Sequence, residues 1–417
     1  MTVTLGVGLH GKIIGYLSQT TKGQIAFRFT ETYLTMTDRP VLSQAFEDDL
    51  SRSYYGKDRS LPSFFANLIP EHGALRSLIE NSLGVSPGDD LALLRAVGRD
   101  LPGAVEIFSV DGDDLPVHED LEVSTHETDH DNLLNKDPGL RFSLAGVQMK
   151  FSVMREPDRI TLPASNQDGE WIVKLGSARF PFNVENEYAM MQWAMSAGFD
   201  VPECYLQDAI TVSSSLKRYT DFGNHVFVIR RYDRHEGLRI HQEDFAQAAN
   251  LRPQLKYDQL KYEQCGGLIK QLLGDEAYYE FIRRLTFVIA SGNADAHLKN
   301  WSFLYLDKQK PSLAPMYDQV CTIAWPELSS ELALKLAGTK NLFALELERF
   351  ELLAERAGAD PTKTTQTVQE TLLQLVDAWN SLHASTLLPQ PHLKLLQNFW
   401  KRVPLLRPHV IQMDWPL

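Results

Sequence analysis

The stretch of residues 292–302, GNADAHLKNWS, carries the pattern that decides how this chain is interpreted. It places the carboxylate of Asp295 and the amide of Asn300 five residues apart. A second carboxylate, Asp318, follows eighteen residues after Asn300, beyond a proline-marked turn and the apolar run 313–316. An Asp, four residues, an Asn and then a second Asp beyond a short strand is the order typical of a phosphotransferase centre.

The chemistry of phosphoryl transfer explains this spacing. The reaction depends mainly on positioning and on neutralising charge. A base must lie beside the attacking hydroxyl, while hard oxygen ligands join a metal ion to the phosphates. The pattern therefore predicts that Asp295 accepts the proton and that Asn300 and Asp318 hold the metal. An Asp-x4-Asn pair also arises about once by chance in a chain of this length, so a polar loop with a helix cap is the alternative for the pair alone.

Composition limits the class of protein. The chain has 417 residues, 43% of them hydrophobic, which predicts two or three packed domains. It has no run of about 18 apolar residues, as a membrane span needs, and its start, MTVTLG, lacks the features of a secretory signal. Its three distant cysteines show neither disulfide nor zinc spacing, which favours a cytoplasmic protein. The net charge of −13 argues against a surface that binds nucleic acid along its whole extent.

The order of the apolar patterns predicts an α+β fold. Strand-like segments are expected as hairpins within residues 1–35 and as single strands at 147–154, 171–174 and 225–231. Helix-like patterns cover 61–83, 89–97, 186–197, 265–273, 276–290, 341–357 and 364–385. Residues 111–131 are acidic and poor in core residues, which indicates a linker. Strands, a helix, strands and a helical half have the outline of a two-lobed kinase.

One apparent nucleotide motif is rejected. Residues 6–11, GVGLHG, match the dinucleotide-binding pattern G-x-G-x-x-G, and Glu31 lies twenty residues beyond the last glycine. That fingerprint requires a helix to begin at the loop, because the pyrophosphate binds to the helix N-terminus. The residues that follow, KIIGYL, have a strand pattern instead. We therefore predict a glycine-bearing hairpin turn.

Residues 142–150, FSLAGVQMK, are a better candidate for binding phosphate, because Ala145 and Gly146 let the backbone approach closely. Lys174 ends the next strand pattern, where kinases keep the lysine that contacts the α- and β-phosphates. Glu187, near the start of the following helix, is a candidate ion-pair partner for Lys174. Taken alone, Lys174 is more often an ordinary strand-end lysine, and Glu187 is more often an acid in the first turn of a helix. Their order along the chain favours the functional interpretation. As a strand-end residue, Lys174 is expected to contribute little packing, so that Lys174→Ala leaves the fold intact.

With these segments in view, the sequence resembles the HipA family of bacterial serine/threonine kinases, the toxins of HipBA-type toxin–antitoxin pairs. The resemblance covers nearly the whole chain and rests on SLAGVQMK (143–150), WIVK (171–174), GNADAHLKNWS (292–302) and MYD (316–318), with QED (242–244) and LKY (255–257) as further family-like words. It implies a two-lobed protein-kinase-like α+β fold with a β-rich N-terminal subdomain and a mostly helical C-terminal lobe. The expected domains are an N-terminal subdomain (1–110), an acidic linker (111–132), a kinase N-lobe with the phosphate loop (133–233) and a helical C-lobe with the catalytic loop (234–417).

The resemblance also implies roles for individual residues. Asp295 would be the catalytic base, and Asn300 and Asp318 would be the Mg²⁺ ligands. Ser143 matches the serine that family members autophosphorylate, and a phosphate there would clash with the phosphates of ATP. Contacts to ATP are implied for Ala145, Gly146, Val147, Gln148, Met149, Lys150, Lys174, Arg230, Arg231, Tyr232, His297, Lys299 and Tyr317, with Glu187 supporting Lys174 through an ion pair.

The function implied by the resemblance is that of a growth-arrest and persistence toxin. It would be a Mg-ATP-dependent protein serine/threonine kinase that phosphorylates a translation component, such as an aminoacyl-tRNA synthetase, and silences itself through Ser143. Its implied partner is a HipB-like helix-turn-helix antitoxin, through which it would reach operator DNA, and no membrane is implied.

Two other functions remain open at this point. An acidic surface and a separate N-terminal subdomain also suit a corepressor with weak or no catalysis. Kinases of small molecules or lipids share the same catalytic geometry, since a fold does not fix the substrate. Repression that survives Asp318→Ala, in a protein without phosphotransfer, would indicate the corepressor, and a phosphorylated metabolite would indicate the small-molecule kinase.

Overall fold

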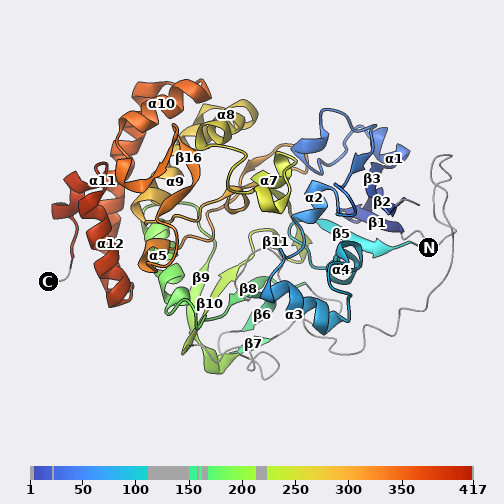
Figure 1. Cartoon of the computed structure of the whole chain (residues 1–417), viewed down its shortest axis with the longest axis horizontal. Coiled ribbons are helices and arrows are strands. Elements are labelled where there is room, and N and C mark those ends of the chain that lie inside the picture. The colour runs from blue at the N-terminus through green and yellow to red at the C-terminus, as the bar shows by residue number, and fades with distance from the viewer. Residues whose placement is uncertain are drawn as a thin grey trace. The chain divides into compact units, whose positions relative to one another are not determined.

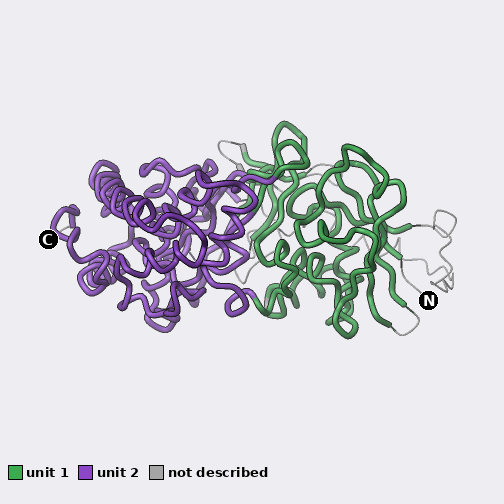
Figure 2. Tube along the Cα trace, turned by 90° about the horizontal axis from the view of Figure 1, so that it is seen from above, with its two compact units in different colours: residues 1–173, 231–255, 303–310 green, residues 174–230, 256–302, 311–417 purple. Residues whose placement is uncertain are grey.

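The computed structural model describes residues 4–20, 23–110, 150–156, 159–161, 168–212 and 223–415 (Figure 1). The expected acidic linker and most of the expected phosphate loop, Ser143 and residues 145–149 included, therefore lie outside the described residues. The chain divides into two compact units (Figure 2), the first formed by residues 1–173, 231–255 and 303–310 and the second by residues 174–230, 256–302 and 311–417. The domain boundaries expected from the sequence stay a prediction.

The first unit contains an antiparallel five-stranded sheet in the order β4-β3-β2-β1-β5. Four phenylalanines, Phe27, Phe46, Phe64 and Phe65, form a buried aromatic core with ring centroids 4.9 to 5.7 Å apart. The elements of this amino-terminal part are β1 (Thr4–Leu9), β2 (Lys12–Gln19), β3 (Ile25–Phe29), α1 (Glu31–Leu34), η1 (Gln44–Phe46), β4 (Tyr54–Tyr55), α2 (Ser63–Ala66), α3 (Ala74–Leu83), α4 (Asp90–Val97) and β5 (Val105–Ser109).

Later segments of the chain complete the first unit. Strand β6 lies between β7 and β8, and β13 pairs with β14. These elements are β6 (Lys150–Glu156), β7 (Arg159–Thr161), β8 (Trp171–Lys174, whose last residue belongs to the second unit), β11 (Arg234–His235), β12 (Leu238–Arg239), β13 (His241–Asp244), α7 (Phe245–Ala248), η5 (Pro253–Leu255) and β14 (Ser302–Tyr305, whose first residue belongs to the second unit).

The glycine-rich segment 6–11 is a hairpin, as predicted. Strands β1 and β2 pair antiparallel through Leu9 and Lys12, and the two residues between them, His10 and Gly11, have φ of 50° and 74°. Two consecutive positive φ angles are the signature of a tight hairpin turn. Gly6 has a packing reason, because a Cβ there would lie 2.4 Å from the ring of Phe108 on the paired strand β5. The glycines therefore form the turn and the close packing of the β-hairpin, and no helix follows them.

The continuous helix expected over residues 61–83 is wrong. The structure has two short helices, α2 and α3, separated at Pro70 and Gly73. Helix α2 ends at Ala66, and the side-chain amide of its C-cap residue, Asn67, donates to Ser63 O at 2.9 Å. Gly73 precedes α3 with φ of 154°. A side chain that competes for helical carbonyls and a proline without an N–H together stop the helix.

The second unit is mostly helical and packs around tryptophans. Trp193 contacts Phe287, Trp379 and Trp400, with ring centroids 4.8 to 6.3 Å apart, and all four rings are buried. Its elements are α5 (Asn183–Ser196), β9 (Cys204–Asp208), η4 (Ala209–Thr211), β10 (His225–Arg230), α8 (Tyr262–Leu273), α9 (Asp275–Ala290), η6 (Leu298–Asn300), β15 (Ser312–Leu313), η7 (Thr322–Ala324), β16 (Glu331–Leu336), β17 (Thr339–Asn341), η8 (Leu342–Ala344), α10 (Glu348–Ala357), α11 (Pro361–Leu382), η9 (Ala384–Thr386), α12 (Gln390–Arg402) and η10 (Arg407–Gln412).

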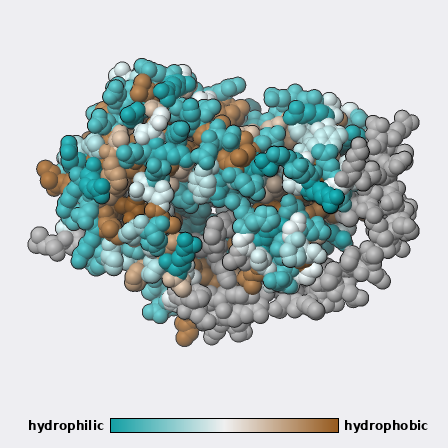
Figure 3. Space-filling model, viewed as in Figure 1, coloured by the Kyte–Doolittle hydropathy of each residue, from teal (hydrophilic) through white to brown (hydrophobic). Residues whose placement is uncertain are grey.

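Most predicted elements of this unit are confirmed within a few residues. The helix expected over 341–357 is an exception, because α10 begins only at Glu348. Asn341 instead caps the short turn η8, where its side chain accepts a hydrogen bond from the backbone of Phe343. The face of the molecule seen in Figure 3 is mainly hydrophilic, with smaller hydrophobic groups between the polar residues. None of the helices in the described part of the chain is both long and apolar enough to cross a membrane.

Glu243 on β13 is a carboxylate without solvent access in the first unit, at 0% exposure. The Ser43 hydroxyl donates to it, the Gln44 backbone N–H donates at 3.0 Å, and the Tyr305 hydroxyl donates at 2.5 Å. None of these three donors carries a positive charge. Burial raises the pKa of Glu243 to about 7, against the opposing effect of the hydrogen bonds from Ser43 and Tyr305.

We expect Glu243→Gln to stabilise the protein at alkaline pH relative to wild type. The pKa of Glu243 is raised on folding, so the folded state holds its proton while the unfolded state loses it. Stability is therefore fully present below the ordinary glutamate pKa and falls as pH rises towards about 7, by up to about 3 kcal/mol. The glutamine side chain of the variant carries no charge at any pH, and its amide can donate to the Ser43 hydroxyl.

The measurement is the difference in Tm between variant and wild type at pH 5 and at pH 8, with the exposed Glu31→Gln as the control. The difference should grow in favour of Glu243→Gln at pH 8 and stay flat for the control. A difference that does not change with pH would contradict an abnormal titration of Glu243.

Candidate active site

Lys174 lies between two carboxylates of the second unit. It ends β8, its ammonium donates to Glu187 Oε1 on α5 at 2.6 Å, and it also donates to Asp318 Oδ1. Lys174 is 5% exposed and Glu187 1%, so this pair is shielded from water, whereas Asp318 keeps 35% of its side chain exposed. The ion pair with Glu187 that the sequence suggested is thus present, and Asp318 joins it.

Lys174 stays protonated at neutral pH. Burial, taken alone, lowers the pKa of an ammonium group, but the attraction of Asp318 and Glu187 outweighs it and raises the pKa of Lys174 above its ordinary value. The stability that comes from a raised lysine pKa is fully present below the ordinary value and is lost only at more alkaline pH. Lys174 is therefore a cation throughout the neutral range.

Asn300 and Asp318 meet, as the expected pair of metal ligands requires. The Asn300 amide Nδ2 donates to Asp318 Oδ2 at 3.1 Å. Asp318 adopts a left-handed backbone conformation with φ of 57°, which is uncommon for a residue other than glycine and turns its carboxylate into this cluster. The other amide atom, Asn300 Oδ1, is buried and has no hydrogen-bond partner among the described residues.

These oxygens fit a divalent cation of the Mg²⁺ type. Such an ion takes one or two protein ligands and completes its shell with water and phosphate oxygens. An unpaired buried oxygen beside a carboxylate offers two ligands of the required hard type, and it leaves the rest of the shell to a nucleotide. Within the described residues, no group of three or more His, Cys, Asp or Glu side chains could hold a metal ion alone. The residues present therefore suit a metal that arrives with its phosphates.

Asp295 lies on an irregular loop that is fixed by its own neighbours. The loop follows α9 through Gly292, whose φ is 65°. The Asn293 side chain accepts from the Asp295 backbone N–H at 3.0 Å, and the Asp295 carbonyl accepts from the His297 N–H at 2.7 Å. The carboxylate itself is at the surface, where the Tyr257 hydroxyl donates to Oδ1 at 2.8 Å. The exposed Asp295 carboxylate is accessible from solvent.

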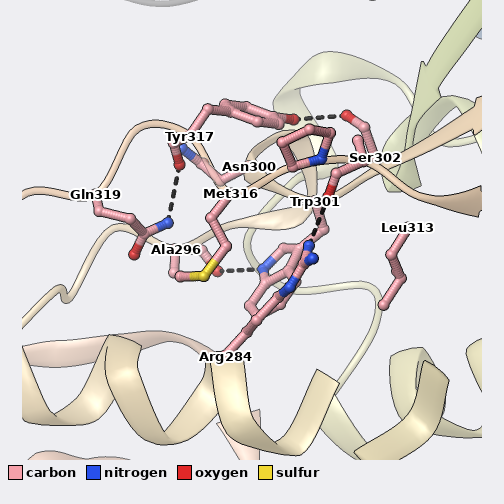
Figure 4. A pocket seen from close by; sticks show the side chains of 11 residues that line it. Arg284, Ala296, Asn300, Trp301, Ser302, Leu313, Met316, Tyr317 and Gln319 are labelled. Atoms are coloured by element: carbon pink, nitrogen blue, oxygen red, sulfur yellow. Dashed lines mark hydrogen bonds between the residues drawn. The ribbon is translucent and has the colours of Figure 1, made fainter. Parts of the chain in front are cut away.

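Tyr317 and Lys299 belong to the same unit as Asn300 and Asp318. The Tyr317 hydroxyl forms hydrogen bonds with Ser302 Oγ at 2.6 Å and with the Lys299 carbonyl at 2.9 Å. Figure 4 shows Tyr317, Ser302 and Asn300 around a small pocket. The hydroxyl of Tyr317 is thus bonded to the loop, and the ATP contact implied for Tyr317 stays a prediction.

His297 is a neutral side chain packed against Tyr257. Their ring centroids lie 5.1 Å apart with an interplanar angle of 78°. Burial, helped by the charge of Lys256, lowers the pKa of His297 to about 3, so the ring carries no charge at neutral pH. A loop-fixing role suits this packing, and the ATP contact implied for His297 stays a prediction.

The Arg231 side chain belongs to a buried ion-pair network of the first unit and is 5% exposed. Its guanidinium donates to Asp100 at 2.6 Å and to Asp233 at 2.9 Å, and Arg234 joins both carboxylates. The Arg231 guanidinium is thus engaged in ion pairs within the first unit. The ATP contact implied for Arg231 stays a prediction.

The remaining residues expected to contact ATP belong to both units. The Tyr232 hydroxyl donates to Gln242 in the first unit, where Lys150 begins β6. Arg230 ends β10 in the second unit. Ser143 and residues 145–149 are outside the described residues, so their expected roles are carried forward unchanged.

Comparisons with known proteins show the family to which the chain belongs. The HipA N-terminal domain model matches residues 5–108, and the HipA-like C-terminal domain model matches residues 142–379. The chain belongs to the HipA family. It is 36% identical over 383 residues to Putative kinase Y4dM of Sinorhizobium fredii, which covers 90% of this chain and 91% of the relative.

HipA proteins of one other bacterium extend the comparison. The serine/threonine-protein kinase toxin HipA of Shewanella oneidensis is 25% identical over 330 residues, or 71% of each chain. A solved complex of Shewanella oneidensis HipA and HipB with operator DNA matches with a TM-score of 0.72 at 21% identity, over 98% of this chain and 97% of that chain. The α+β, kinase-like HipA fold predicted from the sequence is thereby confirmed.

Proposed function

We propose that this HipA-family chain is a Mg-ATP-dependent protein serine/threonine kinase and the toxin of a bacterial toxin–antitoxin pair. The observation that carries the proposal is the cluster in which Lys174 binds both Glu187 and Asp318 while Asn300 donates to Asp318. A purely structural ion pair needs one carboxylate, and it leaves no amide oxygen unpaired beside it. Two carboxylates, a buried cation and a free hard ligand together suit phosphate and metal.

Each residue of the second unit has a distinct proposed task. Lys174 contacts the α- and β-phosphates, and Glu187 holds its ammonium in place. Asn300 and Asp318 hold the magnesium ion, which neutralises the charge of the phosphates when it is bound. Asp295 accepts the proton of the attacking hydroxyl, since it is the carboxylate that the loop leaves at the surface. Residues 145–150 are proposed to cover the phosphates.

Regulation and partners are proposed from the family relationship. Phosphate on Ser143 would add about −1.5 to −2 charges next to the site for ATP phosphates, so autophosphorylation should silence the enzyme. The match to a HipA–HipB–operator DNA complex supports a HipB-like antitoxin as the partner, and operator DNA as a target reached through it. A translation component, such as an aminoacyl-tRNA synthetase, is the proposed protein substrate.

Phosphopeptide mass spectrometry on wild type and Asp295→Asn, each incubated with Mg-ATP, tests this function. We expect phosphate on Ser143 in the wild type only, because only the wild type has the base. Phosphate in neither protein, with operator repression intact, would favour the corepressor. A phosphorylated metabolite with no phosphoprotein would favour the small-molecule kinase. Equal phosphorylation of both proteins would remove Asp295 from the mechanism.

A further inference from the structure

We infer that Tyr257, the last residue of the family-like motif LKY (255–257), is a positioning residue for Asp295. The inference rests on the proposed function, because it concerns how the proposed base is oriented. The observation is the hydrogen bond from the Tyr257 hydroxyl to Asp295 Oδ1 at 2.8 Å. It joins two residues 38 positions apart in the chain, both in the second unit.

The Asp295 side chain gains orientation from this bond. It is exposed on an irregular loop, where the hydrogen bond from its backbone N–H to Asn293 holds the main chain. A general base must reach the substrate proton at about 2.6 to 3.2 Å, and an exposed carboxylate samples several rotamers. A hydrogen bond to one oxygen selects a single rotamer. A carboxylate has about four acceptor positions, and the phenol occupies one of them.

Tyr257 is itself anchored on the catalytic loop. The carbonyl of the preceding residue, Lys256, accepts from the Leu298 N–H at 3.3 Å, and the Tyr257 ring packs edge-on against His297. The two segments are therefore joined at the backbone, at the ring and at the hydroxyl.

A further contact holds Tyr257 through its main chain. The Lys340 ammonium, on β17, donates to the Tyr257 carbonyl at 3.2 Å and to Asp258 Oδ1 at 3.0 Å. A residue with its main chain and ring both fixed loses little entropy when its hydroxyl binds Asp295. The hydroxyl is a donor that a neutral phenol keeps at physiological pH, so it orients the carboxylate without taking the substrate proton.

The test compares Tyr257→Phe, Asp295→Asn and the double variant. The control is Tyr278→Phe, which removes a buried hydroxyl bound to Thr364 at 3.2 Å. The rate of ³²P transfer from Mg-[γ-³²P]ATP to the chain itself and to added casein is measured, together with KM for ATP and Tm. We expect Tyr257→Phe to lower kcat about tenfold or more, with KM for ATP and Tm unchanged. The control should keep kcat within about twofold of wild type.

The double variant shows whether Tyr257 acts through Asp295 or independently of it. The double variant should be no slower than Asp295→Asn, because a residue that acts only through Asp295 has nothing left to orient. A kcat for Tyr257→Phe within twofold of wild type, a rise in KM for ATP or a lowered Tm would each overturn the inference. So would a further loss of rate in the double variant. If Asp295→Asn is as active as wild type, it is the proposed function that fails.

Discussion

Asp318→Asn is expected to lower phosphotransfer by about a thousandfold at a fixed Mg²⁺ concentration. The variant removes the negative charge of one proposed metal ligand and keeps its shape. Asparagine also tolerates the left-handed backbone found at this position, where φ is 57°. A substitution by alanine would add backbone strain to the loss of the ligand, so Asp318→Asn is the cleaner variant.

The fold should survive this change. Lys174 keeps its bond to Glu187, and the new side-chain amide at position 318 can donate to the unpaired Oδ1 of Asn300 after that side chain turns. Tm in the absence of nucleotide should therefore stay close to that of wild type. The rate of ³²P transfer is measured over a range of Mg²⁺ concentrations, with the exposed Asp200→Asn as the control. Transfer above a tenth of the wild-type rate would remove Asp318 from the metal site.

The parts of the site that follow one another along the chain could be predicted from the sequence. Asp295 and Asn300 share one loop, Lys174 ends a strand, and Glu187 lies in the second turn of the following helix. Local apolar patterns were enough to place these elements within a few residues, because each strand or helix has its own periodicity. The fold class followed from the order of the elements. The hairpin at residues 6–11 was also predictable, since a strand pattern after the glycines excludes a helix.

Contacts between distant segments could not be predicted. Glu243 meets Ser43 across 200 positions, and Arg231 meets Asp100 across 131 positions. Nothing in the local pattern of Arg231 separates a buried network from an ATP contact, since both need an arginine after an apolar strand. The Tyr257–Asp295 contact was also missed, because the two residues lie 38 positions apart. The motif LKY (255–257) was the one signal in the sequence that drew attention to Tyr257.

Lys174→Met should abolish the rise in Tm that Mg-ATP produces and should also destabilise the protein by about 3 to 5 kcal/mol. The second effect corrects the expectation that a strand-end lysine contributes little. Lys174 and Glu187 have only 7% and 1% of their side chains exposed, so the variant leaves Glu187 as a buried charge without its cation. Lys270→Met is the matched control. Its ion pair with Asp275 is partly exposed, at 29% and 63%, so its loss should change the stability little.

The double variant Lys174→Met/Glu187→Gln separates stability from nucleotide binding. Removing both charges of a buried pair costs far less than removing one, so the Tm without nucleotide should recover most of its loss. ATP binding should not recover, because the cation that contacts the phosphates is still missing. A ligand that binds only the folded state raises Tm by an amount that grows with its concentration relative to Kd, so thermal shifts with and without Mg-ATP report both stability and nucleotide binding. A double variant that regains the ATP-induced rise would show that Lys174 supports the fold and does not touch the nucleotide.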